Sequence, residues 1–247
     1  MSLHPPEQLE LGLGTIGLGR PWPAADDDVP TAEHVAAFLQ AATDLGVRLI
    51  DTAPAYGSSE ARLGAFLATL ARDARDRLFV CTKFGEEWSA EGGSVVDHSE
   101  SARQRSLERS LKRLGRIDLL QIHKCSLDVL ADRALLDWLV ELRSANTVGA
   151  IGASVSDTAT LAAALDLGVF DSVQMPANRE RPDLALMLAE RGGSVVPLLN
   201  RPFGSGSITP GVDAFSWLRR RVPAGVVLSG TTSLRHLSQN LDWMAAG

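Results

Sequence analysis

Residues 78–83, LFVCTK, and residues 118–123, DLLQIH, are short apolar runs that each end in a titratable side chain. Short, almost continuously apolar strands are typical of a parallel sheet that is buried on both faces. Stretches rich in Ala, Leu, Arg and Glu separate the runs, as the helices of a βα repeat do. Six further runs complete the pattern and end at Gly14, Asp51, Ser154, Gln174, Asn200 and Gly230. Eight strands that alternate with helices predict an α/β fold of the (β/α)8 barrel class.

Helix start and stop signals mark the stretches between these runs. We expect helices over the five ranges 31–45, 101–114, 128–145, 157–167 and 182–191. No linker-like or low-complexity segment divides the sequence, and its 247 residues match the roughly 250 of one barrel. The sequence therefore predicts a single domain over residues 1–247.

The composition argues against several classes of protein. A net charge of -6 argues against nucleic acid or an anionic membrane surface as the main partner, because phosphate binding relies on clustered Lys and Arg. No apolar run approaches the roughly 18 residues of a membrane span, and the first residues, MSLHPPEQ, lack the pattern of a signal peptide. Cys81 and Cys125 lie in or beside apolar runs, which favours buried free thiols over a disulfide or a metal site. We therefore expect a cytoplasmic protein that holds no metal.

Gly12, Gly14 and Gly17 match the spacing of a dinucleotide-binding loop, G-x-G-x-x-G, but their surroundings do not fit that motif. The motif needs a helix to begin within the loop. Here the residues PWP at 21–23 follow instead, and they would break a helix at that point. We expect the glycines to let the end of the first strand bend close to a ligand.

Polar side chains end six of the eight apolar runs. Each one alone has an ordinary explanation as a solvated strand end, a hydrogen-bonded structural residue or a cap. Burying unpaired polar groups is costly, however, and a barrel brings the carboxyl ends of its strands to one mouth, where active sites of this fold lie. The pattern predicts a site at that mouth built from Asp51, Lys83, His123, Ser154, Gln174 and Asn200.

Tyr56 lies just beyond Asp51 and is the single tyrosine of the chain. A phenol with its ordinary pKa of about 10 is a weak proton donor at neutral pH, and an adjacent Lys83 ammonium would lower that pKa. Asp51 would hold the ammonium in place, and His123 could polarise a substrate carbonyl. These four side chains suit proton donation to a carbonyl oxygen while a cofactor supplies a hydride to the carbon, because no side chain is a hydride source.

Segments along nearly the whole chain resemble the aldo-keto reductase family, in the family's order. They include LGLGT (11–15), GVRLIDTAPAYGSSE (46–60), LFVCTKFG (78–85), IDLLQIH (117–123), IGAS (151–154), RPFGSG (201–206) and SGTTSLRHLSQNL (229–241). The pattern DTA-x-x-YG-x-SE is the most specific part of the match. The resemblance implies the barrel fold and a catalytic role for Asp51, Tyr56, Lys83 and His123.

The resemblance also implies a nicotinamide cofactor, NADP(H) by the family's usual preference and NAD(H) as the alternative. Ser154 and Gln174 match residues that hold the nicotinamide carboxamide. The remaining matches to cofactor-binding positions lie at the first strand end, in the loop along the pyrophosphate and in the segment at the adenosine end. They are Thr15, Ile16, Asn200, Arg201, Pro202, Phe203, Gly204, Gly206, Gly230, Thr231, Thr232, Ser233, Gln239 and Asn240.

Three departures from the family pattern bear on the cofactor. Val155 stands where the family usually has an Asn, and Asn200 stands where many members carry a Tyr that stacks on the nicotinamide. Gly230 and His236 stand where NADPH-preferring members often carry Lys and Arg, although Arg235 lies close by. The choice between NADPH and NADH is therefore open at this stage.

Two insertions, 19–30 and 85–99, follow strand ends and either cover the mouth or form ordinary surface loops. Trp22 and Trp88 lie in these insertions, where they either line an apolar substrate wall or pack as plugs. Lys124 either is solvated or faces an anionic substrate. These three residues are the candidates for a substrate pocket.

Three functions fit these residues. The first is an NAD(P)H-dependent reductase of aldehydes or ketones with Tyr56 as proton donor. The second is the reverse reaction, an NAD-dependent aldose or alcohol dehydrogenase, which the weakened 2′-phosphate site favours. The third is a catalytically quiet barrel that binds cofactor as a sensor or partner module. The departures motivate the third, as does a tail after Asn240 that is shorter than in many members and leaves the mouth open or covered by residues 85–99.

Overall fold

Eight parallel strands close into a barrel in the computed structural model, which describes residues 6–21 and 29–246. Their order around the barrel is β1-β10-β9-β8-β7-β6-β3-β2. The strands are β1 (Leu9–Gly14), β2 (Leu49–Asp51), β3 (Phe79–Phe84), β6 (Leu119–Ile122), β7 (Ala150–Ser154), β8 (Ser172–Pro176), β9 (Val196–Asn200) and β10 (Gly225–Ser229). The predicted (β/α)8 class is confirmed.

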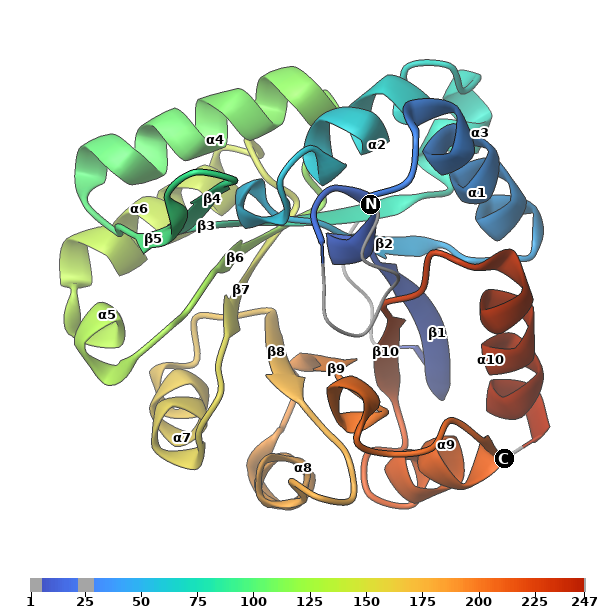
Figure 1. Ribbon diagram of the computed structural model, residues 1–247. Helices are drawn as coiled ribbons and strands as arrows, with labels where there is room; N and C mark the ends of the chain where they lie inside the picture. The colour runs from blue at the N-terminus through green and yellow to red at the C-terminus, as the bar shows by residue number, and fades with distance from the viewer. Residues whose placement is uncertain (1–5, 22–28, 247) are drawn as a thin grey trace.

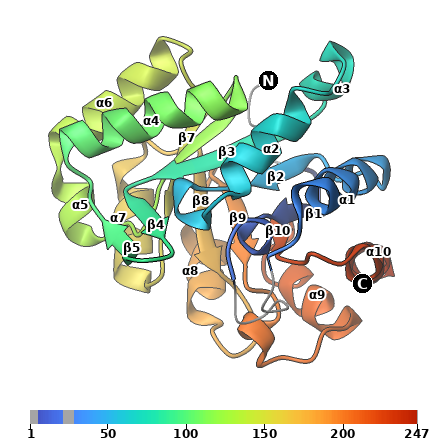
Figure 2. The same ribbon diagram turned by 45° about the horizontal axis from the view of Figure 1, so that its top comes forward.

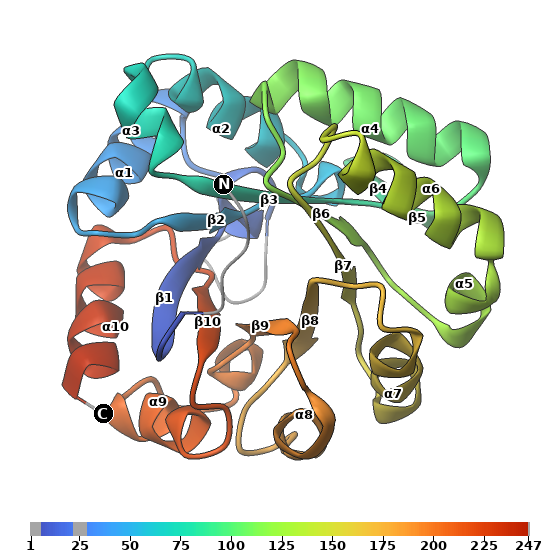
Figure 3. The same ribbon diagram turned by 180° about the vertical axis from the view of Figure 1, so that it is seen from behind.

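Helices surround this ring of strands in both the front and the rear view (Figures 1 and 3). They are α1 (Ala32–Asp44), α2 (Ser59–Leu67), α3 (Arg72–Asp76), α4 (Glu100–Leu114), α5 (Leu127–Ala131), α6 (Arg133–Ser144), α7 (Thr158–Leu167), α8 (Asp183–Arg191), α9 (Val212–Arg219) and α10 (Leu234–Ala246). Of the helices in the described residues, none combines the length and apolar character needed to cross a membrane.

Successive residues of each strand face alternately into the barrel and out toward the helices. The inward positions form a small apolar cluster that includes Leu49, Phe79 and Leu119. The outward positions, such as Ile50 and Val80, belong to the large core between strands and helices. Because the side-chain period of a strand is two, each inward row continues to a polar residue at the mouth: Asp51 after Leu49, Lys83 after Phe79 and Cys81, and Gln121 after Leu119.

The glycine at position 12 serves packing inside the barrel rather than the approach of a ligand. Gly12 lies in regular β1, paired with Leu228 of β10. A Cβ atom there would lie 2.7 Å from Cγ1 of Val226 and 3.2 Å from Cδ2 of Leu49. The expectation that Gly12 lets the strand bend toward a ligand is therefore wrong, and the dinucleotide-loop spacing is coincidental.

The helix predicted over 128–145 is two helices, α5 and α6, with a break at Asp132. Asp132 has an extended backbone, with φ of −75° and ψ of 95°. Its carboxylate accepts a hydrogen bond from the backbone N–H of Leu135 at 3.1 Å, so it is the N-cap of α6. An acidic residue inside a helical pattern can thus end one helix and begin the next. Four further helices, α2, α3, α9 and α10, lie outside the five predicted ranges.

The insertion at 85–99 contains a β-hairpin, β4 (Glu86–Ser89) and β5 (Gly93–Val96), rather than an irregular loop. The hairpin lies beside the 3-10 helix η2 (Pro54–Tyr56), at the edge of the mouth (Figure 2). Gly85, with φ of +98°, turns the chain from β3 into the hairpin, and a Cβ atom there would lie 2.3 Å from Nε2 of His98. This turn brings Glu86 back over the end of the barrel.

Substitution of Gly12 by Ala should lower the free energy of unfolding by about 1–3 kcal/mol, the usual cost of overpacking a rigid core. The stiff β-branched Val226 cannot give way cheaply to the added methyl group. Gly211→Ala is the matched control, because a Cβ atom at Gly211 meets no heavy atom within 4 Å. Urea denaturation of both variants measures the difference, and equal stabilities would contradict the packing argument.

Candidate active site

The ammonium of Lys83 lies at the centre of the barrel mouth and contacts three other residues. Its Nζ atom donates to Oδ1 and Oδ2 of Asp51 at 2.7 and 2.6 Å and to the backbone carbonyl oxygen of Thr52 at 3.1 Å. It also lies 3.1 Å from the hydroxyl oxygen of Tyr56. Phenol, ammonium and carboxylate are therefore in direct contact, as the spacing of the strand ends led us to expect.

The Lys83–Asp51 ion pair is buried, with Lys83 1% and Asp51 2% exposed. Burial alone lowers the pKa of Lys83, but the charge of Asp51, with a smaller contribution from Tyr56, outweighs it and holds that pKa above its ordinary value. Lys83 is therefore a cation at neutral pH. Gln121 was not predicted to belong to this group, yet its Nε2 donates to Oδ1 of Asp51 at 3.2 Å.

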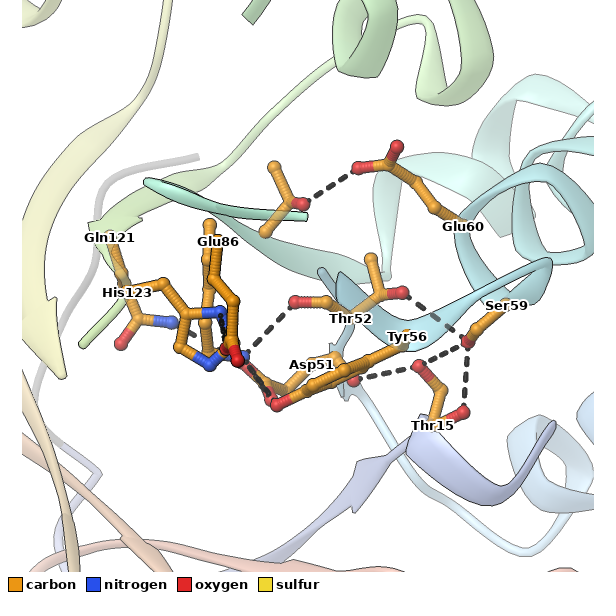
Figure 4. A network of polar contacts seen from close by, with 11 residues as sticks. Thr15, Asp51, Thr52, Tyr56, Ser59, Glu60, Glu86, Gln121 and His123 are labelled. Atoms are coloured by element: carbon orange, nitrogen blue, oxygen red, sulfur yellow. Dashed lines mark hydrogen bonds and ion pairs between the residues drawn. The ribbon is translucent and has the colours of Figure 1, made fainter. Parts of the chain in front are cut away.

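Tyr56 is placed by a buried network under the 3-10 helix η2 (Figure 4). The hydroxyl of Thr15 donates to the backbone carbonyl oxygen of Asp51 at 3.0 Å, and the hydroxyl of Ser59 donates to Thr15 Oγ1 at 2.7 Å. Arg20 donates to the backbone carbonyl oxygen of Ala55 at 3.0 Å. The network joins β1, β2 and the start of α2, so it fixes the backbone on both sides of the phenol.

The pKa of Tyr56 is raised above 10, so the expected net lowering is wrong, although Lys83 does favour the phenolate as expected. Burial is the largest cause, because an ionised phenol loses its water there. Lys83 opposes burial but does not overcome it, and the negative charge of Asp51 adds to the rise. Tyr56 consequently keeps its proton through neutral pH, and Lys83 limits the loss of acidity that burial causes.

His123 follows β6 directly, and its ring stands edge-on to the Tyr56 ring, with centroids 5.9 Å apart and planes at 82°. Burial lowers the pKa of His123 well below its ordinary value, and the nearby charges of Lys83 and Lys124 lower it further. The imidazole is therefore neutral at physiological pH. Glu86, which the sequence analysis missed, places Oε2 3.0 Å from Nδ1 of His123. The Gly-Gly pair at 92–93, between the short segments EEWS and SVV, was the signal for its hairpin.

Three predicted cofactor residues lie on adjacent strands on the opposite side of the mouth: Ser154 and Asn200 end β7 and β9, and Gln174 lies two residues before the end of β8. Ser154 of β7 pairs in register with Gln174 of β8, and Asn200 of β9 pairs with Pro176 two residues further on. Gln174 is 2% exposed. Oδ1 of Asn200 is buried and has no hydrogen-bond partner among the described residues. A buried acceptor without a donor needs an explanation, and a ligand N–H is one.

The predicted loop along the pyrophosphate follows β9 at the rim. Arg201 and Gly204 have left-handed backbone, with φ of 54° and 59°, and Asn178 Nδ2 donates to the carbonyl oxygen of Arg201 at 3.0 Å. Pro202 is buried, and Phe203 packs edge-on against Phe215. Gly206 completes the short 3-10 helix over 204–206.

The predicted adenosine-end residues lie between β10 and α10 and in the first turns of that helix. Gly230 and Gln239 are exposed, and Thr231, Thr232 and Ser233 are half-buried. Asn240 is instead buried, and its Nδ2 donates to Oγ of Ser229 at 2.8 Å. Its amide therefore braces α10 against β10. At the end of the first strand, the hydroxyl of Thr15 is likewise used in a hydrogen bond within the protein. Ile16, next to it, is half-buried.

Two of the three predicted pocket residues lie near the mouth. Trp88 of β4 is half-buried, and the guanidinium of Arg20 stacks over its ring at 5.4 Å. Lys124 has left-handed backbone, with φ of 52°, and its Nζ lies 3.9 Å from Oε1 of Glu86. Trp22 lies outside the described residues.

Comparison with known proteins agrees with this geometry. A sequence model of the Aldo/keto reductase family matches residues 10–183. The chain belongs to the aldo/keto reductase family. The members of this family are oxidoreductases. One relative of the chain is D-threo-aldose 1-dehydrogenase of a Pseudomonas species, which is 34% identical over 69% of this chain and 60% of the relative.

A second relative of this aldo/keto reductase is aldo-keto reductase yakc [NADP(+)] of Schizosaccharomyces pombe, 27% identical over 81% of this chain and 59% of the relative. The chain thus spans about 60% of the length of these two curated relatives. A solved structure from Pseudomonas aeruginosa, assigned to the aldo-keto reductases, has a TM-score of 0.80 and is 32% identical, covering 96% of this chain and 89% of that one.

Removal of the ammonium should destabilise the fold more than removal of the whole ion pair. Lys83→Met leaves Asp51 as an unpaired buried carboxylate, which should cost about 3–5 kcal/mol. The double variant Asp51→Asn/Lys83→Met removes both charges and should be the more stable of the two. Guanidinium denaturation tests this order, and a double variant that is less stable than Lys83→Met would contradict it.

The pKa of Tyr56 can be read directly, because the chain has one tyrosine. The ultraviolet absorbance of tyrosinate should appear above pH 10 in the folded protein. In Lys83→Met it should appear at still higher pH, because the ammonium that favours the phenolate is gone. An ionisation below pH 10, or an unchanged value in the variant, would contradict the balance of burial and charge described above.

Proposed function

We propose that this aldo/keto reductase reduces a small aldehyde or ketone to the alcohol by hydride transfer from NADPH, with Tyr56 as the general acid. The observation that carries the proposal is the 3.1 Å contact between the Tyr56 hydroxyl and the buried ammonium of Lys83. This contact lies at the carboxyl ends of the barrel strands, where enzymes of this fold have their active sites.

The four side chains divide the chemistry of proton donation among them. Tyr56 holds its proton at neutral pH and donates it as negative charge develops on the substrate oxygen. Lys83 stabilises the negative charge that the phenol oxygen acquires when the proton leaves. Asp51 keeps Lys83 charged and in place. His123, held neutral, stands beside the phenol as a second hydrogen-bonding group.

The residues on the opposite side of the mouth fit a nicotinamide cofactor, which would supply the hydride that no side chain can provide. Ser154, Gln174 and Asn200 would hold the carboxamide, and the orphaned Oδ1 of Asn200 is suited to accept from its N–H group. Residues 201–206 and 230–233 would hold the pyrophosphate and the adenosine end. The name of the fission-yeast relative supports NADP(H), and NAD(H) is the alternative.

Oxidation of an alcohol or an aldose by the same site is the second candidate function. The aldose 1-dehydrogenase relative favours it, as does the absence of the usual basic pair from positions 230 and 236, where Gly and His stand. In this direction Tyr56 acts as a base and must first lose its proton. The oxidative rate should therefore increase with pH, whereas the reductive rate should decline only where Tyr56 ionises.

Tyr56→Phe should reduce aldehyde turnover by about 10²- to 10⁴-fold, the usual weight of general acid catalysis. The ring and its packing remain, so NADPH should still bind, as measured by its fluorescence. Reduction of a panel of small aldehydes, ketones and sugars by NADPH and by NADH provides the assay. Glu87→Gln, on the half-exposed neighbour of Glu86, is a control expected to keep full activity.

Near-normal turnover by the Tyr56→Phe variant would overturn the proposal. A wild-type protein that binds NADPH but reduces no compound of the panel would favour the catalytically quiet barrel instead. Oxidative turnover confined to high pH, without reductive turnover, would favour the dehydrogenase. The predicted cytoplasmic location and small-molecule partner stay predictions throughout.

A further inference from the structure

Glu86 is a buried carboxylate at the mouth that has no role in the proton donation proposed for Tyr56, Lys83 and Asp51. It is 6% exposed, and its Oε2 lies 3.0 Å from Nδ1 of His123. Nζ of Lys124 approaches its other oxygen, Oε1, at 3.9 Å. Figure 4 shows the carboxylate directly against the edge of the imidazole ring. Burying a carboxylate is costly, and the structure places this imidazole and the ammonium of Lys124 beside its two oxygens.

The hairpin that carries Glu86 is tied to the rim of the barrel on both sides of the contact. The backbone N–H of Asp97, after β5, donates to the carbonyl oxygen of Gly85 at 3.0 Å. Nε2 of His98 lies 2.8 Å from the backbone carbonyl oxygen of His123. The carboxylate and the ring that it faces are therefore held by the same connections, and their relative position is fixed.

The imidazole that faces Glu86 carries a single proton at neutral pH. Cations surround His123 from several elements: Lys83 of β3, Lys124 and Arg20, with His98 also close. Burial and these charges together lower the pKa of His123 well below its ordinary value. A neutral imidazole has one N–H donor and one bare nitrogen that accepts. The question is then which nitrogen holds the proton.

The carboxylate decides between the two nitrogens. An ionised carboxylate only accepts hydrogen bonds, so a bare Nδ1 lone pair 3.0 Å from Oε2 of Glu86 would be repelled. A proton on Nδ1 turns this repulsion into attraction, although the N–H is not aligned for a straight hydrogen bond. Nδ1 is buried and lies against Glu86, so Nε2, separated from it by one ring carbon, is the nitrogen left for a substrate.

We propose that Glu86 is a positioning residue that fixes His123 in the tautomer protonated at Nδ1 and so presents Nε2 as a hydrogen-bond acceptor. The partner of one ring nitrogen generally sets the protonation of the other. The sequence had led us to expect that His123 polarises a substrate carbonyl by donating a hydrogen bond to it. In this tautomer Nε2 cannot donate that bond. It accepts a hydrogen bond from an oxygen that bears a proton.

The hydrogen-bonding roles of Tyr56 and His123 together indicate which ligand the mouth prefers, and this step rests on the proposed function. Tyr56 donates to the substrate oxygen and Nε2 of His123 accepts from it. An oxygen that meets both demands is a hydroxyl, as in an alcohol or the hemiacetal of a sugar, and a carbonyl oxygen meets only the first. The site therefore holds the alcohol of an alcohol–carbonyl pair more tightly than the carbonyl compound.

The tautomer can be measured by ¹⁵N NMR of histidine-labelled protein, both free and loaded with NADP⁺, because protonated and bare ring nitrogens have well separated shifts. The chain has five histidines, and the signals lost in His123→Gln identify this one. At pH 7 we expect a protonated Nδ1 and a bare Nε2. In Glu86→Gln, the fraction protonated at Nε2 should rise by about tenfold, because the negative charge that favours the Nδ1 proton is removed.

Glu87→Gln is the matched control, because it makes the same change one residue further along β4, on a side chain that is 46% exposed. Its His123 signals should match those of the wild type. Glu86→Asp keeps the charge and should keep the Nδ1 proton, which separates charge from packing. A wild-type His123 protonated at Nε2, or a Glu86→Gln spectrum equal to that of the wild type, overturns the proposal.

Ligand affinity gives a second test. For the best alcohol–carbonyl pair of the panel, the NADP⁺-loaded wild type should favour the alcohol, and Glu86→Gln should reduce that preference about tenfold. An unchanged preference overturns the assignment of the preferred ligand. If the panel yields no substrate, the proposed function fails while the ¹⁵N spectrum still decides the tautomer. Should Glu86→Gln not fold, the wild-type spectrum alone decides it.

Discussion

The buried ion pair between Lys83 and Asp51 is the interaction on which the rest of the mouth depends. Removing two charges from water costs several kcal/mol per ion unless each finds close partners. The barrel supplies them because β2 and β3 are hydrogen-bonded neighbours, with Asp51 opposite Cys81. Lys83 lies two residues beyond Cys81 on the same inward face, so its ammonium reaches both oxygens of Asp51. Tyr56 then contacts an ammonium whose position and charge are already fixed.

Burial and charge compete at each titratable group of the mouth, and a different effect prevails at each one. Burial prevails at Tyr56, which stays a phenol beside a cation. Charge prevails at Lys83, which stays an ammonium although it is fully enclosed. Both effects act in the same direction at His123, which stays a neutral imidazole. The result is a proton donor, a fixed positive charge and a neutral ring within one small volume at neutral pH.

The hairpin β4–β5 adds a second carboxylate to this volume. It is inserted between a barrel strand and the helix that follows, where the fold tolerates variation without loss of its core. Glu86 reaches the imidazole from outside the ring of strands, whereas Asp51 reaches the ammonium from inside it. Each of the two buried carboxylates therefore fixes the charge or the tautomer of one partner, and neither has to contact a substrate.

The sequence by itself determined the barrel class and brought Asp51, Lys83 and His123 to one mouth, because these follow from local periodicity and from the inward row of each strand. Tyr56 was placed there by its position just beyond Asp51. Asp51, Lys83 and His123 each end such a row, so naming the strands was enough to bring them together. The break at Asp132 and the hairpin at 86–96 were missed because a cap and a turn compete with a helical or loop-like pattern on small energy differences. Only the tertiary structure decided the direction of the Tyr56 pKa and the presence of Glu86 beside His123. Both depend on how much water the folded chain excludes and on contacts between segments far apart in sequence, and neither quantity is written in a local pattern.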